Sequence, residues 1–140
     1  MNIQIADTDE KILKCRDAIL ALRPHLKDAD LVQLVKGMIA EGYQLAFIEE
    51  GGQAAAAIGF RYLQFLFNGK HFYIDDLSTL TEFRGKGYGS ALLDYVGDKA
   101  KELGFQQITL DSGHHRHDAH RLYLNKEFVI HSHHFTKKIN

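Results

Sequence analysis

The spacing of apolar and polar positions predicts an alternating order of strands and helices along the chain. Alternation in residues 1–6 predicts a short first strand. An amphipathic helix follows, with a capping-box-like pair at Asp7 and Glu10, and it ends before Pro24. A second amphipathic helix starts near Asp30. The first quarter of the chain therefore predicts one strand followed by two helices.

The middle of the chain predicts three consecutive strands. Residues 44–50, 53–67 and 70–80 are rich in β-forming side chains. Gly51-Gly52 separates the first two segments and Asn68-Gly69 the last two, and both pairs favour tight hairpins. We therefore expect an antiparallel meander.

The last third predicts helix, strand, helix and strand. A helix after residue 90 is expected to end at Gly104, and residues 106–111 then form a strand that pairs in parallel with the preceding one. Ala119, Leu122 and Tyr123 fit a short helix, and residues 128–137 fit a closing strand. The order is β-α-α-β-β-β-α-β-α-β, which predicts an α/β (α+β) fold with a mixed, mostly antiparallel sheet.

A glycine-rich segment joins the strand ending near residue 80 to the long helix. It reads Arg84-Gly85-Lys86-Gly87-Tyr88-Gly89-Ser90. A helix N-terminus presents unpaired N–H groups and partial positive charge, and glycines let the backbone approach an anion closely. The segment therefore predicts a site for a phosphate-bearing ligand. Neither the dinucleotide fingerprint nor the Walker pattern fits its glycine spacing. A plain glycine-rich turn is the alternative.

Two signatures resemble the GNAT superfamily of N-acetyltransferases. Arg84-x-x-Gly87-x-Gly89 is similar to its acyl-CoA loop, and the order of elements is that of the superfamily. Ala119-x-x-x-Tyr123 followed by Phe128 is similar to its second signature, although Glu127 stands where glycine is usual. Within the superfamily, the chain resembles the small bacterial members. The run from Arg116 to Arg121 also resembles aminoalkylphosphonate N-acetyltransferases. The resemblance covers the whole chain.

The resemblance implies acetyl-CoA as co-substrate, held between strands four and five, which splay apart. Loop amides with Arg84 and Lys86 are expected to bind pyrophosphate, and residues 77–79 the pantetheine arm, although these could instead form an ordinary buried strand. The candidate coenzyme contacts are Leu77, Ser78, Thr79, Arg84, Gly85, Lys86, Gly87, Tyr88, Gly89, Ser90, Arg116 and Lys126.

The chemistry implied is direct transfer of an acetyl group to a primary amine in a ternary complex, because no serine or cysteine has a nucleophile setting. Tyr123 is the candidate general acid, since a phenol stays protonated at neutral pH; a core tyrosine is the alternative. Asp75 and Asp76 are candidate proton acceptors or acceptor-binding charges. Being adjacent on a strand, they should point to opposite faces, with Asp76 preferred for the cleft.

Composition limits the remaining possibilities. The length predicts a single domain over residues 1–140. A net charge of −1 predicts no nucleic-acid partner. No stretch is apolar enough to span a membrane. A lone Cys15 on an apolar stripe predicts a buried packing residue and suits the cytoplasm; no signal peptide is recognisable. A homodimer is open, because the aromatic positions on the third strand could be core or dimer surface; they are Phe60, Tyr62, Phe65 and Phe67.

Two other functions stay open. A catalytically silent acyl-CoA-binding or regulatory module would keep the loop and tolerate loss of Tyr123. A histidine-rich metal-binding protein is the third possibility, because seven of the nine histidines follow residue 113. Their spacing does not demand a metal, and we expect none.

Overall fold

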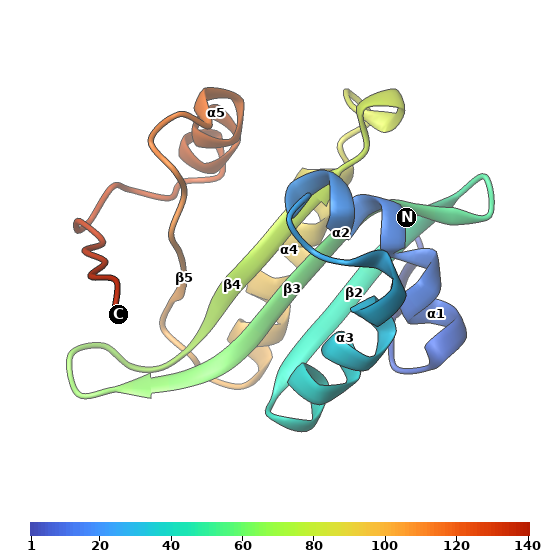
Figure 1. Ribbon diagram of the computed structural model, residues 1–140. Helices are drawn as coiled ribbons and strands as arrows, with labels where there is room; N and C mark the ends of the chain where they lie inside the picture. Colours follow the sequence, from blue (N-terminus) through green and yellow to red (C-terminus); the bar gives the residue numbers. More distant parts are fainter. The chain divides into compact units, whose positions relative to one another are not determined.

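Five strands form one mixed sheet in the computed structural model, which describes residues 1–140 (Figure 1). The strands lie side by side in chain order: β1 (Ile3–Ile5), β2 (Tyr43–Glu50), β3 (Gln53–Phe65), β4 (Gly69–Thr79) and β5 (Ile108–Leu110). The first four are antiparallel to their neighbours, and β4 pairs with β5 in parallel. The predicted meander and the parallel pair are both confirmed.

Helices cover both faces of this sheet. On one face lie α1 (Asp9–Lys14), α2 (Arg16–Leu22) and α3 (Leu31–Ala40), which is preceded by the 3₁₀ turn Asp28–Asp30. On the other lies α4 (Tyr88–Glu102), which follows the 3₁₀ turn Thr81–Phe83 and runs behind the strands in Figure 1. None of the helices is long and apolar enough to cross a membrane.

The first predicted helix is in fact two helices. The chain breaks at Cys15, which ends α1 and begins α2. The cap also differs from the prediction, because Thr8 and not Asp7 is the N-cap residue. Its side chain accepts a hydrogen bond of 3.2 Å from the backbone N–H of Lys11, which satisfies one of the free donors of the first turn.

The core has two layers because strand side chains alternate between the faces. Toward α1–α3 the sheet presents Tyr43, Leu45 and Phe47, which pack with Ile12, Cys15, Ala18, Leu31 and Val35. Toward α4 it presents Phe60 and Phe72, whose rings meet edge to face 5.1 Å apart, and Phe60 also meets Tyr95 of α4. Phe60 is thus core, whereas Phe65 and Phe67 are exposed, and a homodimer stays a prediction.

Cys15 is fully buried, as predicted from its place on an apolar stripe. Burial raises the pKa of its thiol to about 12, because the apolar surroundings disfavour the thiolate. The thiol is therefore a neutral packing group at ordinary pH and not a nucleophile.

The chain divides into two compact units, residues 1–110 and 111–140. The second unit contains α5 (His117–Asn125), which confirms the predicted short helix. The predicted closing strand at residues 128–137 is wrong: this segment forms no helix or strand. A strand needs a neighbouring strand to which it can hydrogen-bond, and no other segment of the second unit is a strand. That residues 1–140 fold as one domain stays a prediction.

Candidate functional site

The glycine segment lies where the sequence predicts, between β4 and α4. Gly85 and Gly87 both have left-handed backbone conformations, with φ of 80° and 81°. Gly87 is the N-cap residue of the 15-residue helix, and no side chain caps that end. The first amides of α4 are therefore free of side-chain acceptors, as an anion site requires.

The two cations of the segment have different partners. The Arg84 Nε lies 3.5 Å from the carbonyl oxygen of Thr79. The Lys86 ammonium forms a 2.7 Å ion pair with Oε1 of Glu50, at the end of β2, and lies 5.4 Å from the centre of the Phe83 ring. The segment therefore carries positive charge, part of which Glu50 balances.

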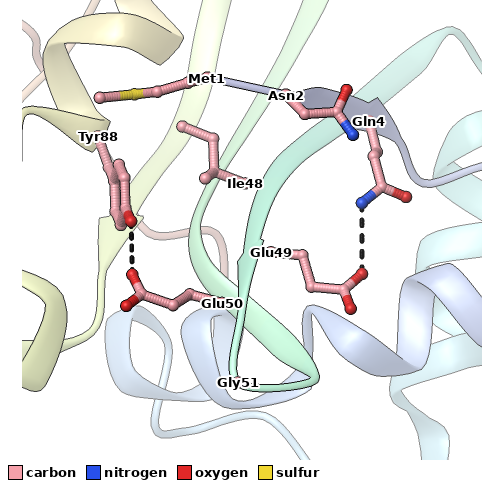
Figure 2. Close-up of a pocket in the computed structure, with 8 residues that line it drawn as sticks. All are labelled: Met1, Asn2, Gln4, Ile48, Glu49, Glu50, Gly51 and Tyr88. Carbon is pink, nitrogen blue, oxygen red and sulfur yellow. Dashed lines mark hydrogen bonds between the residues drawn. The ribbon is translucent and has the colours of Figure 1, made fainter.

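Glu50 also accepts a hydrogen bond from the Tyr88 hydroxyl (Figure 2). Hydrogen bonds from Lys86 and Tyr88 lower the pKa of the Glu50 carboxyl, so it is ionised at neutral pH. The same contact raises the pKa of Lys86 and of Tyr88, so both remain proton donors. Sequence reasoning missed Glu50, because 36 residues separate it from Lys86 and nothing in the spacing links them.

Residues 77–79 lie on β4 beyond the point where its pairing with β5 stops. That pairing ends at Ile74 with Leu110, whereas β4 runs on to Thr79 with its other edge paired to β3. Within residues 1–110 no strand covers the β5-side edge of β4 beyond Ile74. The Ser78 hydroxyl donates a 2.7 Å hydrogen bond to the carbonyl of Ala18, so this side chain ties β4 to α2.

A β-bulge places Asp75 and Asp76 on the same face of the sheet. Gly59 pairs with Asp76 and Phe60 pairs with Ile74, so Asp75 is an extra residue in β4. Asp75 binds the side chain of Arg61 and Asp76 that of Tyr43, and these two partners are paired on β3 and β2 and share one face. The expectation of opposite faces is wrong, because it assumed uninterrupted alternation.

Each aspartate is bound to an arginine. Asp75 accepts hydrogen bonds from both Nε and Nη2 of Arg61, at 3.0 and 2.7 Å. Asp76 is 2.9 Å from Nη2 of Arg23 and accepts a 2.8 Å bond from the Tyr43 hydroxyl. Arg23 also donates to the carbonyl of Asp75, which satisfies the backbone at the bulge.

Gly59 makes room for the Tyr43 ring. A Cβ at Gly59 would overlap the hydroxyl and ζ carbon of Tyr43 and lie 2.6 Å from its ε1 carbon. The ring thus crosses β3 over the glycine to reach Asp76. Burial, followed by the charge of Asp76, raises the pKa of Tyr43 well above its ordinary value, so the phenol stays a donor. A lone glycine in an apolar strand is a sequence signal for such a close approach, and Gly59 gives that signal.

Tyr123, Arg116 and Lys126 belong to the second unit. Burial raises the pKa of the Tyr123 phenol, and the charge of Arg116 offsets part of that rise. The Tyr123 ring packs against Phe128, with centroids 5.8 Å apart. Glu127 has a φ of 69°, the one left-handed residue that is not glycine. The turn after α5 is thus kept although glycine is absent.

The histidines do not gather into a metal site. His114 lies beside His115 and His117 beside His120, with ring centres 5.7 and 6.1 Å apart. No group of three or more histidine, cysteine or acidic side chains lies together in a way that could hold a metal ion. The metal-binding alternative therefore has no assembled ligand set.

Comparison with known proteins identifies the family. The sequence profile of the acetyltransferase (GNAT) family matches residues 15–128. The chain is 39% identical over 100 residues to the uncharacterized N-acetyltransferase YhdJ of Bacillus subtilis (strain 168), spanning 71% of this chain and 70% of that protein. It is 33% identical over 66 residues to an aminoalkylphosphonate N-acetyltransferase of Salmonella typhimurium, spanning 47% of this chain and 43% of that one.

A solved structure shows the same fold. A predicted acetyltransferase from Clostridium acetobutylicum, determined with acetyl-CoA, superimposes with a TM-score of 0.74 at 20% identity, covering 98% of this chain and 95% of the other. The strand order, the parallel β4–β5 pair and the glycine segment before α4 agree with the family assignment. The chain is a GNAT-family N-acetyltransferase.

Proposed function

We propose that this protein transfers an acetyl group from acetyl-CoA to the primary amine of a small molecule, in one step within a ternary complex. The observation that carries the proposal is the uncapped N-terminus of α4 beside the left-handed Gly85 and Gly87. Free amides, helix polarity and two cations fit a pyrophosphate. The coenzyme that the family uses thus fits the residues present.

Coenzyme binding is divided between the loop and β4. In the proposal, Arg84, Lys86 and the backbone of residues 85–90 bind the pyrophosphate, while the open edge of β4 at residues 77–79 binds the pantetheine arm. Arg116 and Lys126 are further proposed contacts. Holding the thioester and the amine in reacting geometry can supply about 7–11 kcal/mol of the barrier, so positioning is itself a catalytic contribution.

The transfer forms a C–N bond and breaks the C–S bond of the thioester. The nitrogen gives up two protons. We assign Asp76, with Asp75 as the second candidate, to accept the ammonium proton before attack. The second proton leaves the nitrogen once the C–N bond has formed and replaces the proton that the Tyr123 hydroxyl gives to the thiolate. The departing thiolate must gain a proton, which we assign to the Tyr123 hydroxyl. Because burial raises the pKa of this phenol, it keeps its proton at neutral pH. The products are the N-acetylated amine and free coenzyme A.

A small-molecule acceptor is supported by one comparison. The Salmonella relative is named for aminoalkylphosphonates, and its likeness covers under half of this chain. We propose the broader class of small primary amines. A cytoplasmic location, expected from the lone cysteine, stays a prediction.

Calorimetric titration with acetyl-CoA tests the loop. Replacing Arg84 and Lys86 by alanine should weaken binding at least about tenfold, because both cations are assigned to phosphate oxygens. The matched control replaces Lys99 and Lys101, which removes two charges from the far end of the same helix and should leave affinity unchanged. A folded wild-type protein that does not bind acetyl-CoA would contradict the proposal.

Thiol release with a panel of amines tests the chemistry. Tyr123→Phe and Asp76→Asn should each lower kcat by about 10²-fold while coenzyme affinity is kept. Unchanged turnover in either variant removes the role assigned to that residue. A wild-type protein that binds acetyl-CoA but turns over no amine would favour the catalytically silent module.

A further inference from the structure

One carboxylate binds both side chains that flank the left-handed Gly87. Lys86 precedes Gly87 and forms a 2.7 Å ion pair with Oε1 of Glu50. Tyr88 follows Gly87, and its hydroxyl donates a hydrogen bond to Oε2 of the same carboxylate. The two oxygens of Glu50 therefore hold the loop on either side of its turning residue.

This double contact bears on the part of the loop that a phosphate would use. Gly87 is the N-cap of α4 and Tyr88 is its first helical residue, and no side chain caps this end. The direction of the first amides depends on the conformation at Gly87, and glycine alone restricts that conformation weakly. Tying its two neighbours to the end of β2 restricts it further without occupying the amides.

The neighbour of Glu50 in sequence has different partners. Glu49 accepts a 3.0 Å hydrogen bond from the Lys14 ammonium and a 3.3 Å bond from the Gln4 amide. The two glutamates line one hollow of about 430 Å³. In Figure 2, Glu50 points toward Tyr88 and Glu49 toward Gln4. Two adjacent ion-paired glutamates thus differ in whether they contact the loop, which makes Glu49 a matched control.

We propose that Glu50 is a positioning residue of the coenzyme phosphate site: it orders the loop around Gly87 so that the first amides of α4 are held ready for the anion. The inference rests on the proposed function, because the anion is the pyrophosphate of acetyl-CoA. Glu50 acts through Lys86 and Tyr88 and does not itself contact the coenzyme. A preordered loop loses less conformational freedom on binding, which improves affinity.

The alternative is that Glu50 weakens coenzyme binding. Glu50 neutralises part of the charge of Lys86 and would repel a phosphate. If it competes with the pyrophosphate for Lys86, it weakens the binding of acetyl-CoA. The two readings predict opposite signs for the same substitution. The ion pair is partly exposed, with Lys86 46% and Glu50 35% accessible, so either effect is expected to be modest.

The first experiment compares Glu50→Ala, Glu50→Gln and Glu49→Ala in steady-state kinetics. Glu50→Ala should raise the KM for acetyl-CoA about fivefold with kcat within twofold of wild type. Glu50→Gln keeps an acceptor oxygen for Tyr88 and should fall between. Glu49→Ala should match wild type. An unchanged or lower KM in Glu50→Ala overturns the proposal, and so does a fall in kcat as large as the rise in KM.

The second experiment needs no coenzyme. Hydrogen exchange of amides 86–90 in the free protein should be at least about threefold faster in Glu50→Ala than in wild type or Glu49→Ala, because the loop opens more often. Equal exchange in all three overturns the proposal. If wild type binds no acetyl-CoA, the proposed function fails, while this measurement still decides whether Glu50 orders the loop.

Discussion

Replacing Gly59 by alanine tests how the bulge in β4 is held. The added Cβ would occupy the space of the Tyr43 hydroxyl, ζ and ε1 atoms, so the ring must leave β3. Its hydrogen bond to Asp76 is then lost. Its position beside the Arg61 guanidinium, 5.5 Å from the ring centre, is lost as well. One methyl group therefore disconnects β2 from the aspartates.

The expected loss of stability can be estimated from the structure. A hydrogen bond to a charged acceptor is worth about 1.5–3 kcal/mol. The Tyr43 ring is 3% exposed, and partial loss of its burial adds about 1–2 kcal/mol. Replacing glycine inside a strand returns about 0.5–1 kcal/mol. Gly59→Ala should therefore lower the free energy of unfolding by about 3 kcal/mol.

The assay is urea unfolding followed by circular dichroism, in a double-mutant cycle with Tyr43→Ala. All three atoms nearest the added Cβ belong to Tyr43, so Gly59→Ala in the Tyr43→Ala background should be neutral or slightly stabilising. Coupling of this size between two positions is diagnostic of direct contact. A loss below about 1 kcal/mol in wild type, or an equal loss in both backgrounds, would refute the assignment of Tyr43 to Gly59.

Two further predictions concern Cys15 and Glu127. The thiol pKa of Cys15 rises from 9.0 to about 12 on folding, so its contribution to stability is complete below about pH 9 and is lost as pH rises toward 12. The stability advantage of wild type over Cys15→Ala in urea unfolding should thus shrink by about 1–2 kcal/mol between about pH 8 and pH 10.5; a constant difference would contradict this. Glu127→Gly should slow hydrogen exchange of the Lys126 and Phe128 amides, because a left-handed residue with a side chain costs about 1 kcal/mol. Glu127→Ala should give no such gain, and equal effects of the two substitutions would exclude backbone strain as the cause.

Local patterns were sufficient for most of the sheet. The Gly51-Gly52 and Asn68-Gly69 turns fall between β2 and β3 and at the start of β4, where the sequence predicts hairpins. Gly104 follows the end of α4 with a φ of 78°, as expected of a residue that ends a helix. These features depend on residues close in sequence, because the local residues determine the backbone geometry of a tight turn or a helix end.

Features that depend on distant residues were not predictable in the same way. The bulge at Asp75 changes the face of a side chain, and it depends on how β4 pairs with Gly59 of another strand. The closing strand predicted at 128–137 does not form, because a local pattern cannot supply the pairing partner that a strand needs. Glu50 contacts the loop only because folding brings the end of β2 beside it. For the candidate site, sequence located the loop and the aspartates but none of the side chains that hold them.

Those side chains bear on which aspartate is the better proton acceptor. Asp75 binds two nitrogens of Arg61, whose side chain is 27% exposed, so an incoming ammonium would have to displace a bidentate partner. Asp76 accepts from the buried Tyr43 hydroxyl on one oxygen, and its other oxygen lies 3.1 and 2.9 Å from Nε and Nη2 of Arg23, which is 38% exposed at the end of α2. Arg23 is the more accessible partner, and exposed pairs contribute little. An ammonium can therefore replace Arg23 at Asp76 while Tyr43 still orients the carboxylate, which favours Asp76 over Asp75 in the proposed mechanism.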